Sequence, residues 1–114
     1  MSKHDHFRSL AERFIASINA FDVEAAVALF ANDAVIDDPS TGHSFESHAG
    51  IRDYVERYFV GYRTVSRVIS TRHLSDGRLK VRVDFMGDFG HEIGLLHLTQ
   101  GKDGLIQRIN ADLE

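Results

Sequence analysis

The spacing of apolar residues changes near residue 63, and this change limits the folds that the chain can adopt. Before it, apolar residues recur every three or four positions, as on one face of a helix. After it, apolar and polar residues alternate, as in strands with one buried face. The first stripe consists of Phe7, Leu10, Ala11, Phe14 and Ile18. Helices followed by an antiparallel sheet predict an α+β domain.

The first part of the chain predicts three helices with one short strand among them. The first helix ends at a polar break, where Asp22 is a good N-cap because its side chain can accept a hydrogen bond from the next turn. A second, short helix follows, with an inward face that includes Phe30. The sequence predicts a strand over residues 35–38 and an irregular polar segment over residues 40–48. It predicts a third helix over residues 49–61.

The second part predicts a meander of four antiparallel strands. Their turns are marked by Ser75-Asp76-Gly77, by residues 87–90 and by Lys102-Asp103-Gly104. We expect this sheet to curve strongly around the three N-terminal helices and to form a cone. The apolar interior of such a cone is a natural pocket for a small molecule.

Composition excludes several classes of protein. A net charge of −4 argues against a nucleic-acid surface, and the absence of cysteine excludes disulfides and thiolate chemistry. No segment approaches the ~18 apolar residues of a membrane span, and residues 1–6 lack the apolar stretch of a signal peptide. We expect one cytoplasmic domain over residues 1–114, with no metal, no cofactor, no membrane and no nucleic-acid partner.

The segment Asp37-Asp38-Pro39 is the first candidate for chemistry. The chain's one proline favours an extended conformation at Asp38. A carboxylate held beside apolar Val35 and Ile36 can lie at the mouth of a pocket, where loss of hydration makes it a stronger base. The same pattern also fits two solvated aspartates in an ordinary turn.

The chain resembles a known superfamily in several segments: Ile18-Asn19-Ala20-Phe21-Asp22, residues 28–34, Asp37-Asp38-Pro39, Ile51-Arg52-Asp53-Tyr54, and the closing strand with Arg108. Over essentially its whole length it is similar to the nuclear transport factor 2-like (NTF2-like) superfamily. That superfamily includes ketosteroid isomerases, SnoaL-like polyketide cyclases and limonene-epoxide hydrolases. The resemblance implies the cone fold, a homodimer, and a small hydrophobic ligand of steroid or polyketide type.

The first half is most similar to bacterial ketosteroid isomerases, in which the aspartate before the proline is the general base. Asp38 stands at that position. Those enzymes also need two oxyanion donors, but the corresponding residues here are Phe14 and Leu96, which cannot donate. Loss of one such donor typically lowers the rate by ~10²–10³. The resemblance therefore implies a base without its usual partners.

Other side chains can supply a donor. His97 would enter the pocket if its strand slipped by one residue, but otherwise it faces outward. Tyr54, Tyr58 and Tyr62 on the third helix offer hydroxyl groups, although core packing also explains their spacing. The expected pocket is lined by aromatic and aliphatic side chains: Phe14, Ile18, Phe30, Tyr54, Tyr58, Val83, Phe85 and Leu96.

Three functions remain open from the sequence. The first is a cofactor-independent isomerase or cyclase in which Asp38 abstracts a proton next to a carbonyl group. The second is a non-catalytic module for binding a ligand or a protein, since both oxyanion donors are missing. The third is water activation of the epoxide-hydrolase kind by Asp84, Arg108, Asn110 and Asp112, although alternation also places them on the outer face of the sheet.

Overall fold

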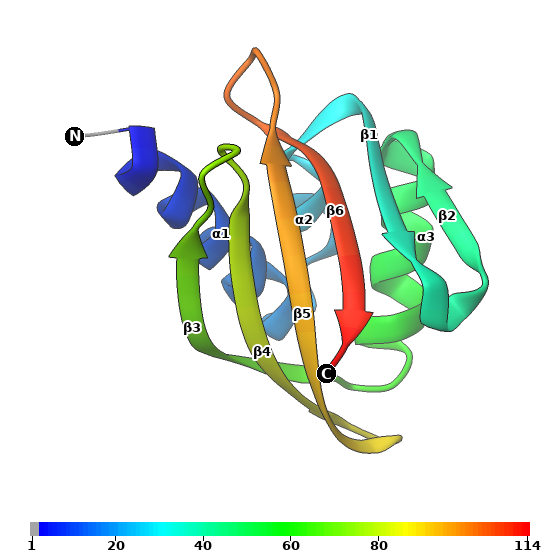
Figure 1. Ribbon diagram of the computed structural model, residues 1–114. Coiled ribbons are helices and arrows are strands. Elements are labelled where there is room, and N and C mark those ends of the chain that lie inside the picture. The colour runs from blue at the N-terminus through cyan, green and yellow to red at the C-terminus, as the bar shows by residue number, and fades with distance from the viewer. Residues whose placement is uncertain (1–2) are drawn as a thin grey trace.

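One curved sheet forms the frame of the molecule, and the helices lie on one of its faces (Figure 1). The computed structural model describes residues 3–114, so the first two residues of the N-terminal segment lie outside the described part. The strand order is β2-β1-β6-β5-β4-β3. The strands are β1 (Phe30–Asp38), β2 (His43–Glu46), β3 (Val65–His73), β4 (Leu79–Gly87), β5 (Gly90–Gln100) and β6 (Ile106–Leu113).

The helices come from the first 60 residues, as the sequence predicts. Together with the curved sheet they confirm the α+β fold. None of the helices in the described part of the chain has the length and apolarity needed to cross a membrane. They are α1 (Lys3–Asn19), α2 (Val23–Val27) and α3 (Ser47–Val55), with a 3₁₀ turn, η1 (Pro39–Thr41), and a π-helical turn, η2 (Glu56–Val60).

The structure corrects the prediction at two strands of the first half. Phe30 begins β1 rather than facing inward from a helix, and β1 pairs in parallel with β6 along the register Phe30↔Ile106 to Asp37↔Asn110. Residues 43–46 form the edge strand β2 instead of an irregular segment, because they pair antiparallel with the end of β1. The extra length of β1 depends on the distant strand β6, and β2 depends on pairing with the end of β1; local strand propensity reports neither pairing.

The core fills the space between α1, α3 and the concave face of the sheet. Phe14 of α1 packs edge-on against Phe30 of β1, with ring centroids 5.4 Å apart. Alternate residues of the central strands complete the core: Leu79, Val81 and Val83 of β4, Leu96 and Leu98 of β5, and Ile109 and Ala111 of β6. Since alternate strand residues share one face, the residues that lie between these core positions are on the outer face.

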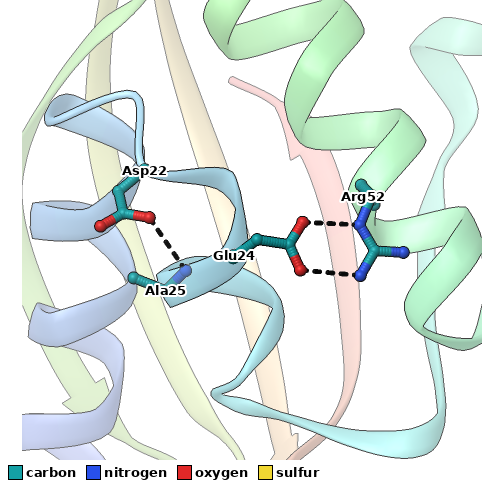
Figure 2. Close-up of polar contacts among 4 residues, drawn as sticks. All are labelled: Asp22, Glu24, Ala25 and Arg52. Carbon is teal, nitrogen blue, oxygen red and sulfur yellow. Dashed lines mark hydrogen bonds and ion pairs between the residues drawn. The ribbon is translucent and has the colours of Figure 1, made fainter.

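Asp22 and Glu24 hold the short helix α2 in place (Figure 2). Ala25 donates its backbone N–H to Asp22 Oδ1 over 3.1 Å, which confirms the predicted N-cap. Arg52 of α3 donates two hydrogen bonds to the Glu24 carboxylate, at 2.7 and 2.9 Å. The pair is exposed, so it orients α2 against α3 more than it stabilises the fold.

Asn19, at the end of α1, binds the free edge of β3. Its Nδ2 donates to the carbonyl oxygen of Ser66 over 2.8 Å, and the backbone N–H of Ser66 donates to Asn19 Oδ1 over 2.7 Å. Because β3 ends the sheet, no further strand satisfies these two backbone groups. Ser66 is only 3% exposed, so water replaces Asn19 poorly.

We expect Asn19→Ala to lower the free energy of unfolding by about 2–4 kcal/mol, since two buried backbone groups would lose their partner. Urea titration measures this change. The matched control is Asn32→Ala, at an exposed position of β1, which should shift the free energy of unfolding by less than about 0.5 kcal/mol. Equal effects of the two variants would contradict the role of Asn19.

Candidate functional site

A cavity of about 230 Å³ lies at one end of the sheet. The ends of β1 and β6, the β4–β5 turn and the segment after α3 come together there, at the lower end of Figure 1. Aromatic rings line the cavity from both sides: Tyr54, Tyr58, Phe59 and Tyr62 from the α3–η2 segment and the loop that follows, and Phe85 and Phe89 from β4 and its turn. The other lining residues are Asp38, Ser40, Thr41, Thr64, Glu92, Leu96, Ala111, Asp112 and Leu113.

Asp38 lines the cavity from the last position of β1. Its backbone is extended, with φ −126°, as the following proline predicts. Oδ2 accepts a hydrogen bond from the Tyr54 hydroxyl over 2.7 Å, and Oδ1 accepts from the hydroxyl and the backbone N–H of Ser40, over 2.6 and 3.1 Å. The carboxylate therefore caps the 3₁₀ turn and borders the cavity at the same time.

Asp37 lies on the opposite face of β1. Its carboxylate is 3.3 Å from the guanidinium of Arg108 in β6, and it is not among the residues that line the cavity. Successive side chains of a strand point to opposite faces, so the two adjacent aspartates occupy different environments. This makes Asp37 a natural control for Asp38.

Tyr54 is a permanent hydrogen-bond donor to Asp38. Burial raises the pKa of its hydroxyl well above the ordinary value of 10.0, and the charge and hydrogen bond of Asp38 raise it further. The hydroxyl therefore stays protonated at neutral pH. Its ring is 6% exposed and packs against Phe45, Tyr58 and Phe59, with centroid distances of 5.0–5.8 Å. This packing holds the donor in one position.

The structure places the four candidate donors differently, and one of them, Tyr62, is 43% exposed at the edge of the cavity. The Tyr54 hydroxyl donates to Asp38, whereas Tyr58 lines the cavity and its hydroxyl has no hydrogen-bond partner among residues 3–114. His97 lies between inward-facing Leu96 and Leu98, which puts it on the outer face of the sheet. Its strand has not slipped, so the predicted donors that line the cavity without a hydroxyl partner among the described residues are Tyr58 and the more exposed Tyr62.

The expected pocket residues fall into two groups. Tyr54, Tyr58, Phe85 and Leu96 line the cavity together with Asp38. The other four, Phe14, Ile18, Phe30 and Val83, differ from the expectation, because they lie in the hydrophobic core and do not line this cavity. The cavity therefore includes only half of the lining residues that the sequence predicted.

Glu92 and Phe89 are cavity residues that the sequence reasoning missed. A signal for Glu92 was present, since it stands two and four positions before Gly94 and Leu96 and so shares their face of β5. Phe89 belongs to the β4–β5 turn, whose side-chain directions do not follow from alternation.

Of the four residues considered for water activation, only Asp112 lines the cavity. Arg108 and Asn110 bind each other on the outer face, with Nε donating to Oδ1 over 2.9 Å. Asp84 contacts Arg67 and His91 there. Burial alone would raise the pKa of Asp84, but hydrogen bonds from these two partners lower it below its ordinary range. Asp112 lines the cavity, while its Oδ1 accepts a hydrogen bond from the backbone N–H of Leu113.

No three histidine, aspartate or glutamate side chains of the described residues lie close enough together to hold a metal ion.

The family model of the SnoaL-like domain matches residues 11–109. This chain belongs to the SnoaL-like family. The match confirms the resemblance to the NTF2-like superfamily that the sequence predicts.

Solved structures share the fold over nearly the whole chain. A protein from Kribbella flavida DSM 17836, provisionally named a ketosteroid isomerase, is 22% identical with a TM-score of 0.81, and the match covers 96% of this chain and 78% of that one. The epoxide hydrolase/cyclase-like enzyme SalBIII, of pyran ring formation in salinomycin, is 18% identical with a TM-score of 0.87. The match covers 100% of this chain and 95% of that one. RV0760c from Mycobacterium tuberculosis, in complex with estradiol-17β-hemisuccinate, is 18% identical with a TM-score of 0.80. The match covers 93% of this chain and 92% of that one. At these identities the likeness shows the fold.

We expect Tyr54→Phe to remove the late step from a tyrosine titration followed by absorbance near 295 nm. In the native protein one of the three tyrosines should ionise only well above pH 10, because the pKa of Tyr54 is raised. A pKa that folding raises stabilises the fold below the ordinary value, and this contribution is lost as pH rises through the folded value. Unfolding at alkaline pH should therefore depend less on pH in the variant.

The matched control for this titration is Tyr62→Phe, since Tyr62 is 43% exposed at the mouth of the cavity. The control should keep the late step. Loss of the late step in Tyr62→Phe but not in Tyr54→Phe would contradict the assignment.

Proposed function

We propose that this SnoaL-like protein is an enzyme that moves a proton next to the carbonyl group of a small apolar compound, with Asp38 as general base and without a cofactor. The observation that carries the proposal is the position of the Asp38 carboxylate in the wall of an aromatic cavity, held there by Tyr54. A general base must lie within hydrogen-bond reach of the carbon acid, and a cavity wall allows that.

The hydrogen bonds of Asp38 leave one oxygen available for the proton. Oδ1 accepts two hydrogen bonds from Ser40, whereas Oδ2 accepts only the one from Tyr54. A carboxylate oxygen has two lone-pair sites, so Oδ2 can still take a proton from the substrate. Tyr54 is thus a positioning residue that holds Oδ2 in a fixed place at the cavity wall.

Tyr58 is the proposed donor to the enolate oxygen. Abstraction of the α-proton leaves negative charge on the carbonyl oxygen, which needs a hydrogen-bond donor in a site with little water. Tyr58 lines the cavity, and its hydroxyl has no partner among the described residues. Asp38 then returns the proton to another carbon of the enolate, so that the net reaction is an isomerisation and no co-reactant is consumed.

The size of the cavity limits the substrate. Its volume of about 230 Å³ is smaller than the ~300–1,000 Å³ of pockets that enclose a drug-sized molecule. We therefore propose a substrate of about two fused rings, or a short polyketide-like chain. A steroid would extend beyond the cavity. Structural relatives named as an isomerase and a cyclase-like enzyme support this class of reaction.

We expect the protein to exchange the α-hydrogens of bicyclic and polyketide-like ketones with deuterium in heavy water, as measured by NMR. A Δ5-3-ketosteroid is included in the panel to test the size limit. Asp38→Asn should slow the exchange by about 10²–10⁴-fold, because its amide cannot accept the proton. Tyr58→Phe should slow it by about 10²–10³-fold.

The matched control for Asp38→Asn is Asp37→Asn, which changes the adjacent aspartate on the outer face. It should leave the exchange rate within about twofold of the native rate. Equal exchange by native protein and Asp38→Asn, or exchange by neither, would contradict a general base at Asp38.

A non-catalytic ligand-binding module is the second candidate. Its support is that Asp38 already caps η1 and that the cavity offers one free tyrosine near it instead of two oxyanion donors. Binding of ketones without any exchange of their α-hydrogens would favour this module over the enzyme.

We also propose that two copies form a homodimer through the outer face of the sheet. The helices cover only the inner face (Figure 1), and the outer face of β5 carries half-buried Ile93 and Leu95 beside His97. Light scattering after size exclusion at micromolar concentration should give about twice the chain mass of 12.8 kDa. Leu95→Asp should give the mass of one chain. A native protein of one chain mass would contradict the dimer.

A further inference from the structure

The charged residues that line the cavity are all acidic. They are Asp38, Glu92 and Asp112, and no lysine, arginine or histidine shares the lining. None of the three forms an ion pair with a basic side chain in the described part of the chain. By contrast, Asp37 and Asp84 on the outer face are both paired with arginine. The cavity therefore carries uncompensated negative charge, and the net charge of the chain, −4, has the same sign.

The walls of the cavity are suited to a cation as well. All three tyrosines of the chain line it, with ring centroids 5.3 Å apart between Tyr54 and Tyr58 and 6.3 Å apart between Tyr58 and Tyr62. Phe89 packs edge-on against Tyr62 at the mouth, with centroids 5.9 Å apart. The faces of such rings attract ammonium groups, and several rings together form the aromatic cages that bind them.

Glu92 is the acidic residue best placed for a ligand cation. It is exposed, it shares the inner face of β5 with Leu96, and its cross-strand partner on β4 is Phe85. Asp37 pairs with Asn110 of β6, so Asp38 is level with the next residue of β6, Ala111. Ala111 pairs in turn with Leu96 of β5. Leu96 is therefore level with Asp38, and Glu92 lies four residues further along β5, about 13 Å toward the turn. A ligand can thus present its reacting carbon to Asp38 and a charged group to Glu92.

We propose that the ligand of this cavity is a cation: an apolar, ring-containing compound with a protonated amine that pairs with Glu92 at the mouth. The inference rests on the proposed function in taking this cavity as the substrate site, and it adds the charge of the substrate. Compounds with a carboxylate or phosphate group are rejected, because they would enter a negatively charged cavity that offers no cationic partner.

Three probes that share one ring system test the charge preference: 2-naphthylmethylamine, 2-naphthalenemethanol and 2-naphthoate, which carry +1, 0 and −1 near pH 7. Their dissociation constants are measured by NMR titration of the native protein. The amine should bind about three- to tenfold more tightly than the alcohol, as expected for a cation among aromatic rings and one exposed carboxylate. The carboxylate should bind most weakly.

The variant Glu92→Gln tests whether Glu92 causes the preference for the amine. It should weaken binding of the amine by about three- to fivefold and leave binding of the alcohol unchanged. The matched control is Glu56→Gln, which removes the same charge from an exposed position outside the cavity and should change neither affinity. If Glu92→Gln weakens the alcohol as much as the amine, Glu92 shapes the mouth and does not bind a cation.

Equal affinity for amine and alcohol, tightest binding of the carboxylate, or binding of none of the three would overturn the inference. Its failure is separable from failure of the proposed function. Exchange of neutral ketones that depends on Asp38, without a preference for the amine, would refute the cationic ligand alone. Preferred binding of the amine, without exchange of any ketone, would support the cationic ligand and refute the general base.

Discussion

The parallel pairing of β1 with β6 is the contact on which the rest of the structure depends. It joins residues 30–37 to residues 106–110, so the helical first half closes onto the last strand of the meander. The ends of β1 and β6 consequently lie side by side, next to the β4–β5 turn (Figure 1). Without this pairing the helices would still have an apolar stripe to bury, but Asp38 would have no cavity to face.

Two further features determine which side chains meet at the cavity: the alternation of side chains along β1 and the aromatic packing of α3 and η2. Alternation along β1 sends Asp37 to Arg108 on the outer face and Asp38 to the inner face. The aromatic packing of α3 and η2 then carries the Tyr54 hydroxyl to within 2.7 Å of the Asp38 carboxylate. The aspartate comes from β1, its donor from α3 and the neighbouring tyrosine from η2, and these three elements meet because the α3–η2 segment packs on the sheet that contains β1.

Agreement between sequence and structure is best where a pattern is local. The stripe of α1, the Asp22 cap and the turns of the meander depend on near neighbours, and the sequence predicts all of them. The early start of β1 was not predicted, because it depends on pairing with the remote strand β6. The strand β2 was not predicted either, although its partner, the end of β1, lies only a few residues away, because its polar sequence carries no strand pattern. Likewise Phe14 and Val83 share a hydrophobic pattern with Leu96, and only packing separates core from cavity wall.

The sequence alone determined the α+β class, the family resemblance and the extended aspartate before the proline, because periodicity and proline geometry are properties of short segments. The tertiary structure decided which side chains that aspartate meets. The Tyr54 hydroxyl donates to Asp38, the Tyr58 hydroxyl has no partner among the described residues, and His97 lies on the outer face. Acidic and aromatic residues line one cavity. These outcomes depend on how far each strand and helix is displaced along its neighbours, which no local pattern specifies.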